Sequence, residues 1–167
     1  KANLYIISTN KMNATQEPQS LELLVIDDDV RIRDLLADLL EASAPPDVTL
    51  NIDKAADGSQ GLDMYHARRN SGRPYDGVFT DLVMPTACGD DVLEGVRKVD
   101  SQTPVYLITG AEATGEYANR LSRAKQFKPD RIIQKPIDLS VFPELLREIV
   151  AKKAKPSTYQ GTETYQS

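Results

Sequence analysis

The sequence predicts an α/β fold, with a doubly wound five-stranded parallel sheet that carries helices on both faces. Two observations support this prediction. Short apolar runs recur five times along the chain, and the longer segments between them place apolar residues three and four positions apart, which is the helical period. Parallel strands require crossover connections, and helices that make these connections cover both faces of the sheet. Strands that alternate with helices in this way are typical of a doubly wound domain.

Each predicted element rests on its own pattern. The strands are the apolar runs, and in chain order they are 21–26, 49–55, 77–80, 104–108 and 131–134. The helices are the periodic segments between and after them, and in the same order they are 32–40, 61–67, 92–99, 117–124 and 139–151. The first helix has a clear apolar face, which Ile32, Leu35 and Leu36 begin, whereas the second helix has a weaker period.

Composition limits the classes of function. The chain has 167 residues, 40% of them hydrophobic, and a formal net charge of -5, so it is long enough for one domain with a sizeable core. The acidic balance and the lack of a basic patch argue against direct binding to nucleic acid. No apolar run approaches the roughly 18 residues of a membrane span, so membrane insertion is not expected. Cys88 is the single cysteine, which excludes an internal disulfide and indicates a reducing compartment. We therefore expect a cytoplasmic protein.

Polar segments flank the predicted domain. Residues 1–20 carry no sustained period and contain Met12, a candidate start of the native chain, so we expect a flexible N-terminal tail. Residues 152–167 are basic and then polar, with Pro156 and Gly161 as breakers, which predicts a second flexible tail. The domain itself is expected to span 21–151.

Polar side chains close four of the apolar runs. They are Asp27, Asp28 and Asp29 after the first run, Asp81 after the third, Thr109 after the fourth and Lys135 after the fifth. Because ligands bind at the carboxyl ends of strands in an open parallel sheet, these residues are candidates for one common site. For Asp29 we favour a simpler role as the N-cap of the first helix.

The chemistry of this set points to a divalent cation and a phosphoryl group. Carboxylates that are brought together repel one another unless a cation neutralises them, and Mg²⁺ is commonly held by one or two carboxylates plus a phosphoryl oxygen. A carboxylate is also a nucleophile toward phosphorus and forms an aspartyl phosphate. A metal ion, a lysine and a hydroxyl then neutralise the oxygens of the transferring group.

The same residues, in this order, resemble the receiver domain of two-component response regulators, of which the chemotaxis protein CheY is a single-domain example. The likeness covers about 21–151. The matching elements are the acidic pair Asp27 and Asp28, the stretch DLVMPTACG with Asp81 and Gly89, the ITG with Thr109, and the QKP with Lys135 and Pro136. The resemblance implies a CheY-like sheet with the strand order 2-1-3-4-5.

The resemblance also implies a role for each position. Asp81 would be the phosphoacceptor, which receives a phosphoryl group from a sensor histidine kinase or a histidine phosphotransfer protein. The implied Mg²⁺ site consists of Asp27, Asp28, Asp81 and the backbone carbonyl of Val83, with Asp27 acting through a metal-bound water. Thr109 and Lys135 would each bind a phosphoryl oxygen. The family commonly has a cis peptide bond before the proline, which here is Pro136.

Four positions depart from the usual family pattern, and one of them is Gly110, which follows Thr109 where the family more often has alanine. Ile132 stands where many members carry an aromatic residue that takes part in switching, so either the switch is muted, or it uses another route, or Ile132 is simply a core residue. Val83 presents an apolar side chain two residues after Asp81, and we expect slow intrinsic loss of the phosphoryl group. Cys88 replaces a common acidic residue, and a redox role for it is not favoured, because no basic neighbour in sequence would lower the pKa of its thiol.

The sequence therefore predicts phosphorelay signal transduction by a switch that catalyses only its own phosphorylation and dephosphorylation. The alternative is a pseudo-receiver that acts as a scaffold without phosphorylation. A phosphatase of the haloacid dehalogenase type is disfavoured, because Arg31 takes the fifth position of the motif that would begin at Asp27. The downstream protein target, the choice between a stand-alone receiver and one domain of a larger regulator or hybrid kinase, and the formation of a homodimer all stay open.

Overall fold

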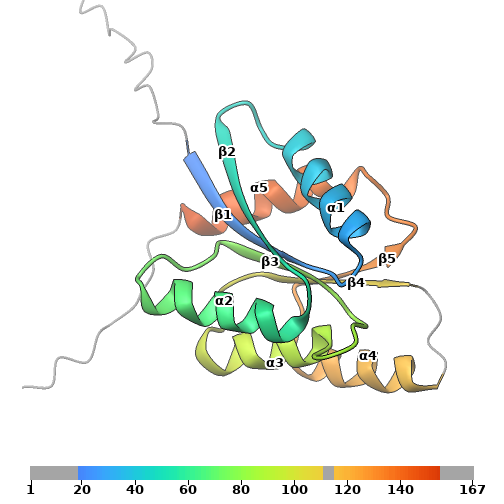
Figure 1. The fold of residues 1–167 in the computed structure, drawn as a ribbon. Coiled ribbons are helices and arrows are strands. Elements are labelled where there is room, and N and C mark those ends of the chain that lie inside the picture. Colours follow the sequence, from blue (N-terminus) through green and yellow to red (C-terminus); the bar gives the residue numbers. More distant parts are fainter. Residues whose placement is uncertain (1–18, 111–114, 155–167) are drawn as a thin grey trace, which may run out of the picture.

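Five parallel strands form the centre of the computed structural model, which describes residues 19–110 and 115–154 (Figure 1). The strands are β1 (Gln19–Ile26), β2 (Val48–Ala55), β3 (Gly77–Asp81), β4 (Val105–Gly110) and β5 (Arg131–Lys135). All neighbouring pairs are parallel, in the order β2-β1-β3-β4-β5. The predicted fold class and strand order are confirmed.

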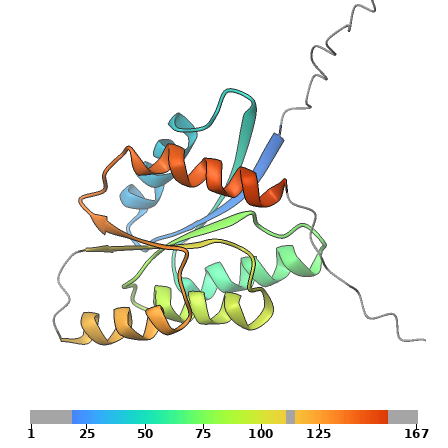
Figure 2. The same ribbon diagram turned by 180° about the vertical axis from the view of Figure 1, so that it is seen from behind.

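Five helices connect and cover the strands. They are α1 (Val30–Ala42), α2 (Gly58–Asn70), α3 (Gly89–Val99), α4 (Glu116–Gln126) and α5 (Val141–Lys153). Helices α1 and α5 lie on one face of the sheet, and α2, α3 and α4 lie on the other, as the two opposite views show (Figures 1 and 2). The described residues thus form three layers, with the sheet in the middle.

The core lies in two halves, one on each face of the sheet. Leu24 and Ile26 of β1 join the cluster that packs under α2 and α3, whereas Leu23 and Val25 join the cluster under α1 and α5. Successive side chains of a strand point to opposite faces, so a strand that is covered on both faces needs an uninterrupted apolar run. This requirement explains why the strands are visible in the sequence as continuous apolar runs.

The ends of several elements differ from the predicted ones. β1 begins at Gln19, before the predicted start, because main-chain pairing with β2 includes Gln19 and Ser20 and does not depend on apolar side chains. The strands β3, β4 and β5 run on at their carboxyl ends to Asp81, Gly110 and Lys135. The helix α5 ends at Lys153. The other residues of the two predicted tails, apart from Ala154, lie outside the described residues.

The helix α2 begins at Gly58, earlier than the predicted residue 61, because Asp57 caps it. The Asp57 side chain accepts a hydrogen bond from the N–H of Gln60, which satisfies one of the free donors in the first turn. A Cβ atom on Gly58 would lie 2.3 Å from the backbone oxygen of Ala87. Only glycine therefore allows α2 to begin this close to the loop that follows β3.

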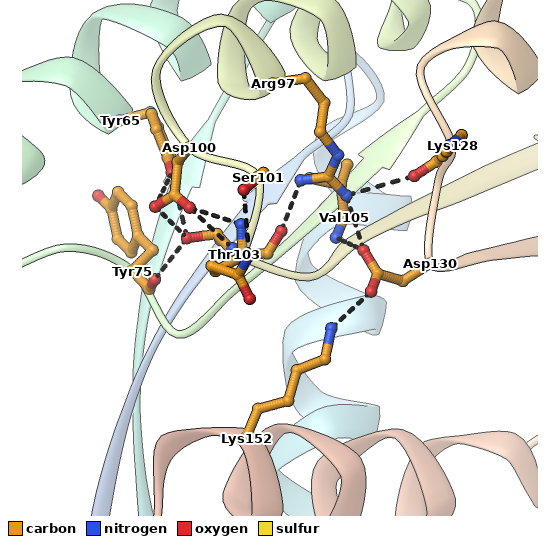
Figure 3. A network of polar contacts seen from close by, with 11 residues as sticks. Tyr65, Tyr75, Arg97, Asp100, Ser101, Thr103, Val105, Lys128, Asp130 and Lys152 are labelled. Atoms are coloured by element: carbon orange, nitrogen blue, oxygen red, sulfur yellow. Dashed lines mark hydrogen bonds and ion pairs between the residues drawn. The ribbon is translucent and has the colours of Figure 1, made fainter. Parts of the chain in front are cut away.

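A polar network joins the amino ends of β3, β4 and β5 to the neighbouring helices (Figure 3). We call it the amino-end network, and its members are Tyr65, Arg97, Asp100, Thr103, Asp130 and Lys152. The Asp130 carboxylate accepts hydrogen bonds from Arg97 of α3 (2.8 Å), the N–H of Val105 in β4 (2.9 Å) and Lys152 of α5 (2.6 Å). One carboxylate thus holds α3, β4 and α5 together. It does so at the amino ends of the strands, opposite the carboxyl ends where the predicted site lies.

Candidate functional site

Three of the predicted site residues meet at the carboxyl edge of the sheet. The Nζ atom of Lys135 lies 2.6 Å from Asp81 Oδ1 and 3.4 Å from Asp27 Oδ2. These residues end β5 and β3 and follow β1, and Lys135 and Asp27 are 108 positions apart in the sequence. The side chains of Asp27 and Asp81 are only 3% and 11% exposed. The parallel sheet therefore gathers two largely buried carboxylates around one ammonium group.

The loop after β3 orients the carboxylate of Asp81. The N–H of Val83 donates to Asp81 Oδ2 at 2.7 Å, so both oxygens of this carboxylate have partners. The N–H of Leu82 donates to the carbonyl of Ile108 at 2.8 Å, and the N–H of Gly89 closes the loop on the carbonyl of Leu82 at 3.0 Å. A Cβ atom on Gly89 would lie 2.4 Å from the backbone oxygen of Asp81. The glycine at this position thus lets the start of α3 lie directly against the end of β3.

Asp27 is held at its side chain and at its backbone. Its Oδ1 atom accepts a hydrogen bond from the N–H of Asp29 at 2.9 Å, and its carbonyl accepts one from Arg33 Nη1 at 2.7 Å. Burial raises the pKa of Asp27; Lys135 and the Asp29 N–H oppose this effect, and the charge of Asp81 adds to it. The net shift is upward, so a nearby cation would stabilise the ionised form.

Lys135 stays charged in this setting. Burial alone would lower its pKa, but the hydrogen bond to Asp81 and the charges of Asp81 and Asp27 outweigh burial and raise it. The ammonium group is therefore present at neutral pH beside both carboxylates. The peptide bond from Lys135 to Pro136 is cis, as the resemblance implies.

The remaining predicted residues lie at the same edge but differ in their surroundings. Asp28 is exposed. Asp29 is the N-cap of α1, and its carboxylate accepts the N–H of Arg31 at 2.9 Å, which confirms the role that we favoured for it. Thr109 is 7% exposed, and its hydroxyl donates to the carbonyl of the adjacent Gly110 at 3.3 Å. This hydroxyl is thus at the correct edge of the sheet and makes a long, local hydrogen bond.

The donor set at this edge fits a magnesium ion. Asp27, Asp28, Asp81 and the Val83 carbonyl offer only oxygen atoms, which are the ligands that Mg²⁺ prefers. Asp27 and Asp81 share one lysine, and Asp28 adds a third carboxylate at the same edge, so the set carries an excess of negative charge for a divalent cation to neutralise.

Among the described residues, the tightest group of potential metal ligands lies elsewhere, at Cys88, Asp90 and Asp91, with one atom of each within 4.8 Å of the others. Arg120 and Arg123 of α4 already pair with both of these aspartates. The charge of this second group is therefore balanced within the protein.

Two of the departures from the family pattern have a structural explanation. Ile132 is partly buried and packs against the core cluster under α2, α3 and α4, as the core interpretation expects. Cys88 is 4% exposed and donates from Sγ to the carbonyl of Met84 at 3.2 Å. The structure also places Arg120, a distant residue in sequence, next to Cys88 in the lining of one cavity. Inspection of sequence neighbours alone did not find this arginine.

Sequence reasoning also missed Arg33 and Asp90. Arg33 contacts the Asp27 carbonyl. The sequence feature that could have identified it is its place six residues after Asp27, in the first turn of α1, close to the end of β1. Asp90 is a charged residue that is only 1% exposed. It stands three positions before Leu93 and six before Val96, both of which are buried. The helical period therefore placed Asp90 on the apolar face of α3.

Comparison with known proteins agrees with this geometry. The sequence pattern of the family described as the response regulator receiver domain matches residues 23–147. The chain belongs to this family. It is similar to the transcriptional regulatory protein ResD of Bacillus subtilis, with 31% identity over 123 residues. It is also similar to hybrid signal transduction histidine kinase I of Dictyostelium discoideum, with 27% identity over 133 residues.

Solved receiver structures share the fold. A response regulator receiver domain protein from Clostridium thermocellum aligns with a TM-score of 0.66 and 23% identity, over 80% of this chain and 96% of that one. The chemotaxis protein CheY4 of Vibrio cholerae aligns with a TM-score of 0.61 and 20% identity, over 78% and 98%. At these identities the likeness shows the fold alone.

The matched relatives are longer than the region that they share with this chain. The alignments cover 74% of this chain and 44% of ResD, and 77% of this chain and 7% of the hybrid kinase. The shared region is the receiver domain of two-component signalling. In the described part of the chain, every helix is too short or too polar to cross a membrane.

Proposed function

We propose that the chain accepts a phosphoryl group on Asp81 in a Mg²⁺-dependent reaction and thereby switches its binding to a protein partner. The donor is the phosphohistidine of a sensor histidine kinase or of a phosphotransfer protein. The observation that carries this proposal is the contact of 2.6 Å between Asp81 Oδ1 and Lys135 Nζ, beside the buried Asp27. Membership of the receiver family supports it.

The proposed reaction is a phosphoryl transfer between two side chains. A carboxylate oxygen of Asp81 attacks phosphorus, the P–N bond to the donor histidine breaks, and the imidazole leaves with the electron pair and takes up a proton. The product is an acyl phosphate on Asp81. Such a transfer depends mainly on positioning and on neutralisation of the phosphoryl oxygens, which is what the surrounding residues offer.

Each neighbour of Asp81 has a separate task. The N–H of Val83 holds one carboxylate oxygen and so sets the orientation of the other. Asp81 loses its negative charge when it is acylated. Lys135, which pairs with that charge before the reaction, then pairs with a phosphoryl oxygen instead. The hydroxyl of Thr109 exchanges its long bond to Gly110 for a bond to a second phosphoryl oxygen. Asp27, Asp28, Asp81 and the Val83 carbonyl hold Mg²⁺, which supplies further positive charge to the phosphoryl group when it is bound.

The chain is thus a switch whose chemistry acts on itself, and its proposed location is the cytoplasm. The relatives that it matches carry the receiver region within longer proteins, so the chain works either as a stand-alone receiver or as the receiver of a longer regulator. The apolar Val83 side chain beside Asp81 leads us to expect a phosphoryl lifetime of minutes or longer. Following the decay of the purified phosphoprotein by intact mass tests this, and loss within seconds would refute it.

Incubation with Mg²⁺ and acetyl phosphate, followed by intact mass spectrometry, tests the function. We expect one phosphate-sized gain in the native chain, no gain in Asp81→Asn, and no gain when a chelator removes Mg²⁺. Asp130→Asn is the matched control, because it changes an aspartate at the other end of the sheet and should keep the gain. A native chain that takes up no phosphate would contradict the proposal and favour the scaffold alternative.

A further inference from the structure

An ion cluster joins α3 to α4 beside the candidate site. Its acidic members are Asp90, Asp91 and Glu94 of α3, and its basic members are Arg120 and Arg123 of α4. Arg123 donates to all three acidic side chains, at 2.6 Å in the case of Asp91 Oδ1. Arg120 Nη1 lies 3.2 Å from Asp90 Oδ1 and 3.7 Å from Asp91 Oδ2. We refer to these five residues as the α3–α4 ion cluster.

Asp90 is the buried centre of this cluster. Its side chain is 1% exposed, whereas Asp91 and Arg123 are 38% and 39% exposed. A buried carboxylate is stable only when it is paired and hydrogen-bonded, and removal of one partner leaves an uncompensated charge. Both arginines are therefore needed, and α4 cannot move away from Asp90 by itself without exposing that charge imbalance.

Asp90 is linked to the main chain at Asp81 through the residue that precedes it, Gly89. The preceding residue, Gly89, is so close to Asp81 that a Cβ atom would lie 2.4 Å from the Asp81 backbone oxygen. Gly89 also donates its N–H to the carbonyl of Leu82. The loop from Leu82 to Cys88, which we call the phosphoacceptor loop, is thus closed at Gly89. A side chain that fixes Asp90 therefore also fixes the end of this loop.

The phosphoacceptor loop and α4 also share part of the apolar core, because Leu82 and Met84 of the loop lie in the same buried cluster as Ala124 of α4. Beside this shared packing, a cavity of about 180 Å³ is lined by Val83, Met84, Pro85 and Cys88 from the loop and by Tyr117 and Arg120 from α4. Within the described side chains of α4, Ala124 is fully buried and Leu121 is partly buried. Two kinds of contact therefore connect α4 to the loop: a shared apolar cluster, whose packing is not directional, and the ion cluster, whose hydrogen bonds fix the position of α4 relative to Asp90.

Phosphorylation of Asp81 needs a structural route by which it changes the surface of the domain. A phosphoryl group adds between one and two negative charges, and the loop beside it must adjust. The β5 side chain at the usual switching position is Ile132, which is partly buried and packs against the core. An aliphatic core side chain offers no aromatic ring to move between a buried and an exposed position.

We propose that Asp90 is a positioning residue for the phosphoacceptor loop, and that its ion pairs with Arg120 and Arg123 carry a movement of this loop to α4. This inference rests on the proposed function, because it describes how phosphorylation of Asp81 is transmitted. On this view α3 and α4 respond as one unit, and the partner-binding surface that changes includes the exposed side of α4.

Hydrogen exchange in the unphosphorylated full-length chain tests the positioning role. The variant Arg123→Met removes the hydrogen bonds to all three acidic residues and keeps a similar side-chain length. We expect several-fold faster amide exchange both in α4 and in residues 82–88. Lys98→Met is the matched control, because the exposed Lys98 pairs with Glu94 of the same cluster and leaves the pairs of Arg120 and Arg123 with Asp90 in place, and it should leave exchange in 82–88 unchanged. Faster exchange in α4 with unchanged exchange in the loop would overturn the proposal.

The same variants, treated with Mg²⁺ and acetyl phosphate, test the transmission. Intact mass measures phosphorylation, and hydrogen exchange measures the response of α4. We expect a change in α4 exchange in the native chain and in Lys98→Met. Arg123→Met should take up phosphate but lose at least half of the α4 change. Arg123→Lys keeps the charge but not the planar fork, so it should restore part of the response. A full response in Arg123→Met would refute the inference.

The two arms separate this inference from the proposed function. If the native chain takes up no phosphate, the proposed function fails, while the exchange of 82–88 in the unphosphorylated variants still decides the positioning role. If Arg123→Met does not fold, Arg123→Lys gives the same comparison in both arms with a smaller expected change.

Discussion

Acidic side chains gather at both ends of the sheet, and their surroundings differ. At the amino end, Asp100 accepts five hydrogen bonds, from Tyr65, Arg69, the N–H of Gln102, and both the N–H and the hydroxyl of Thr103. Burial would raise the pKa of Asp100, but these donors outweigh burial and lower it. At the carboxyl end, burial raises the pKa of Asp27 despite the opposing effects of Lys135 and the Asp29 N–H.

The difference separates a structural anchor from the site that we propose to be reactive. In the amino-end network Asp100 accepts five hydrogen bonds and Asp130 accepts three, so these carboxylates are stabilised without any ligand. At the carboxyl end, Asp27 and Asp81 share the single ammonium group of Lys135, and the exposed Asp28 adds a third negative charge, so this edge keeps an excess of negative charge. That excess is a cost to the folded protein until a cation binds. Residue type is the same at both ends, and the balance of donors decides the role.

The largest expected contrast comes from removing one carboxylate at the reactive end. Asp81→Asn should lose all phosphate uptake from acetyl phosphate, because the amide is no nucleophile toward phosphorus. Its free energy of unfolding should stay within about 1 kcal/mol of the native value, since one charged contact is exchanged for a polar one. Intact mass and urea unfolding measure the two quantities. Uptake in Asp81→Asn would show that another residue is the phosphoacceptor.

The next contrast uses two lysines that each lie 2.6 Å from an aspartate, Lys135 beside Asp81 and Lys152 beside Asp130. Lys135→Met should slow phosphorylation by acetyl phosphate about 10²-fold, because one cation that stabilises the developing charge is lost. Lys152→Met should leave the rate unchanged. Initial rates at saturating Mg²⁺ provide the measurement. Equal rates in the two variants would place the site away from Lys135.

The opposite pattern is expected at the amino end. Asp100→Asn should lower the free energy of unfolding by about 2–3 kcal/mol, because an amide cannot accept all five hydrogen bonds and leaves buried donors unpaired. It should keep phosphate uptake at the native rate. Urea unfolding and intact mass test both statements. A loss of uptake in a folded Asp100→Asn protein would break the proposed division of roles between the two ends.

The smallest effect is a difference in the pH dependence of stability. The folded chain has a raised pKa at Asp27 and a lowered pKa at Asp100, against an ordinary value of 3.8. Asp27 therefore adds to the free energy of unfolding below pH 3.8, and this contribution is lost as the pH rises through the folded-state pKa of Asp27. Asp100 adds to the free energy of unfolding above pH 3.8, and this contribution is lost as the pH falls through the folded-state pKa of Asp100.

Unfolding measured from acidic to neutral pH checks these signs. Relative to the native chain, Asp27→Asn should gain stability as the pH rises. Asp100→Asn should show its full deficit at neutral pH, and the deficit should shrink in acid. The same sign for both variants would mean that the two ends of the sheet do not differ in charge balance.

The sequence was sufficient for the architecture and for most of the candidate site. Uninterrupted apolar runs mark doubly covered strands, and the helical period marks the segments between them, because both patterns are local. The rule that parallel strands end at one edge then predicted that Asp81 and Lys135 would be neighbours. Local capping chemistry likewise identified Asp29 as an N-cap, which the structure confirms.

The tertiary structure decided which of these residues touch and which are buried. Asp27 is buried and Asp28 is exposed, although the two are adjacent in sequence and both follow the end of β1 at Ile26. Arg123 reaches Asp90 from 33 residues away, and no local pattern encodes that contact. Contacts of this kind depend on how helices pack across the sheet, whereas strand, helix and cap depend on neighbours along the chain. Sequence by itself therefore determined the elements and the edge of the sheet that carries the candidate site, and packing alone decided the balance of charge there.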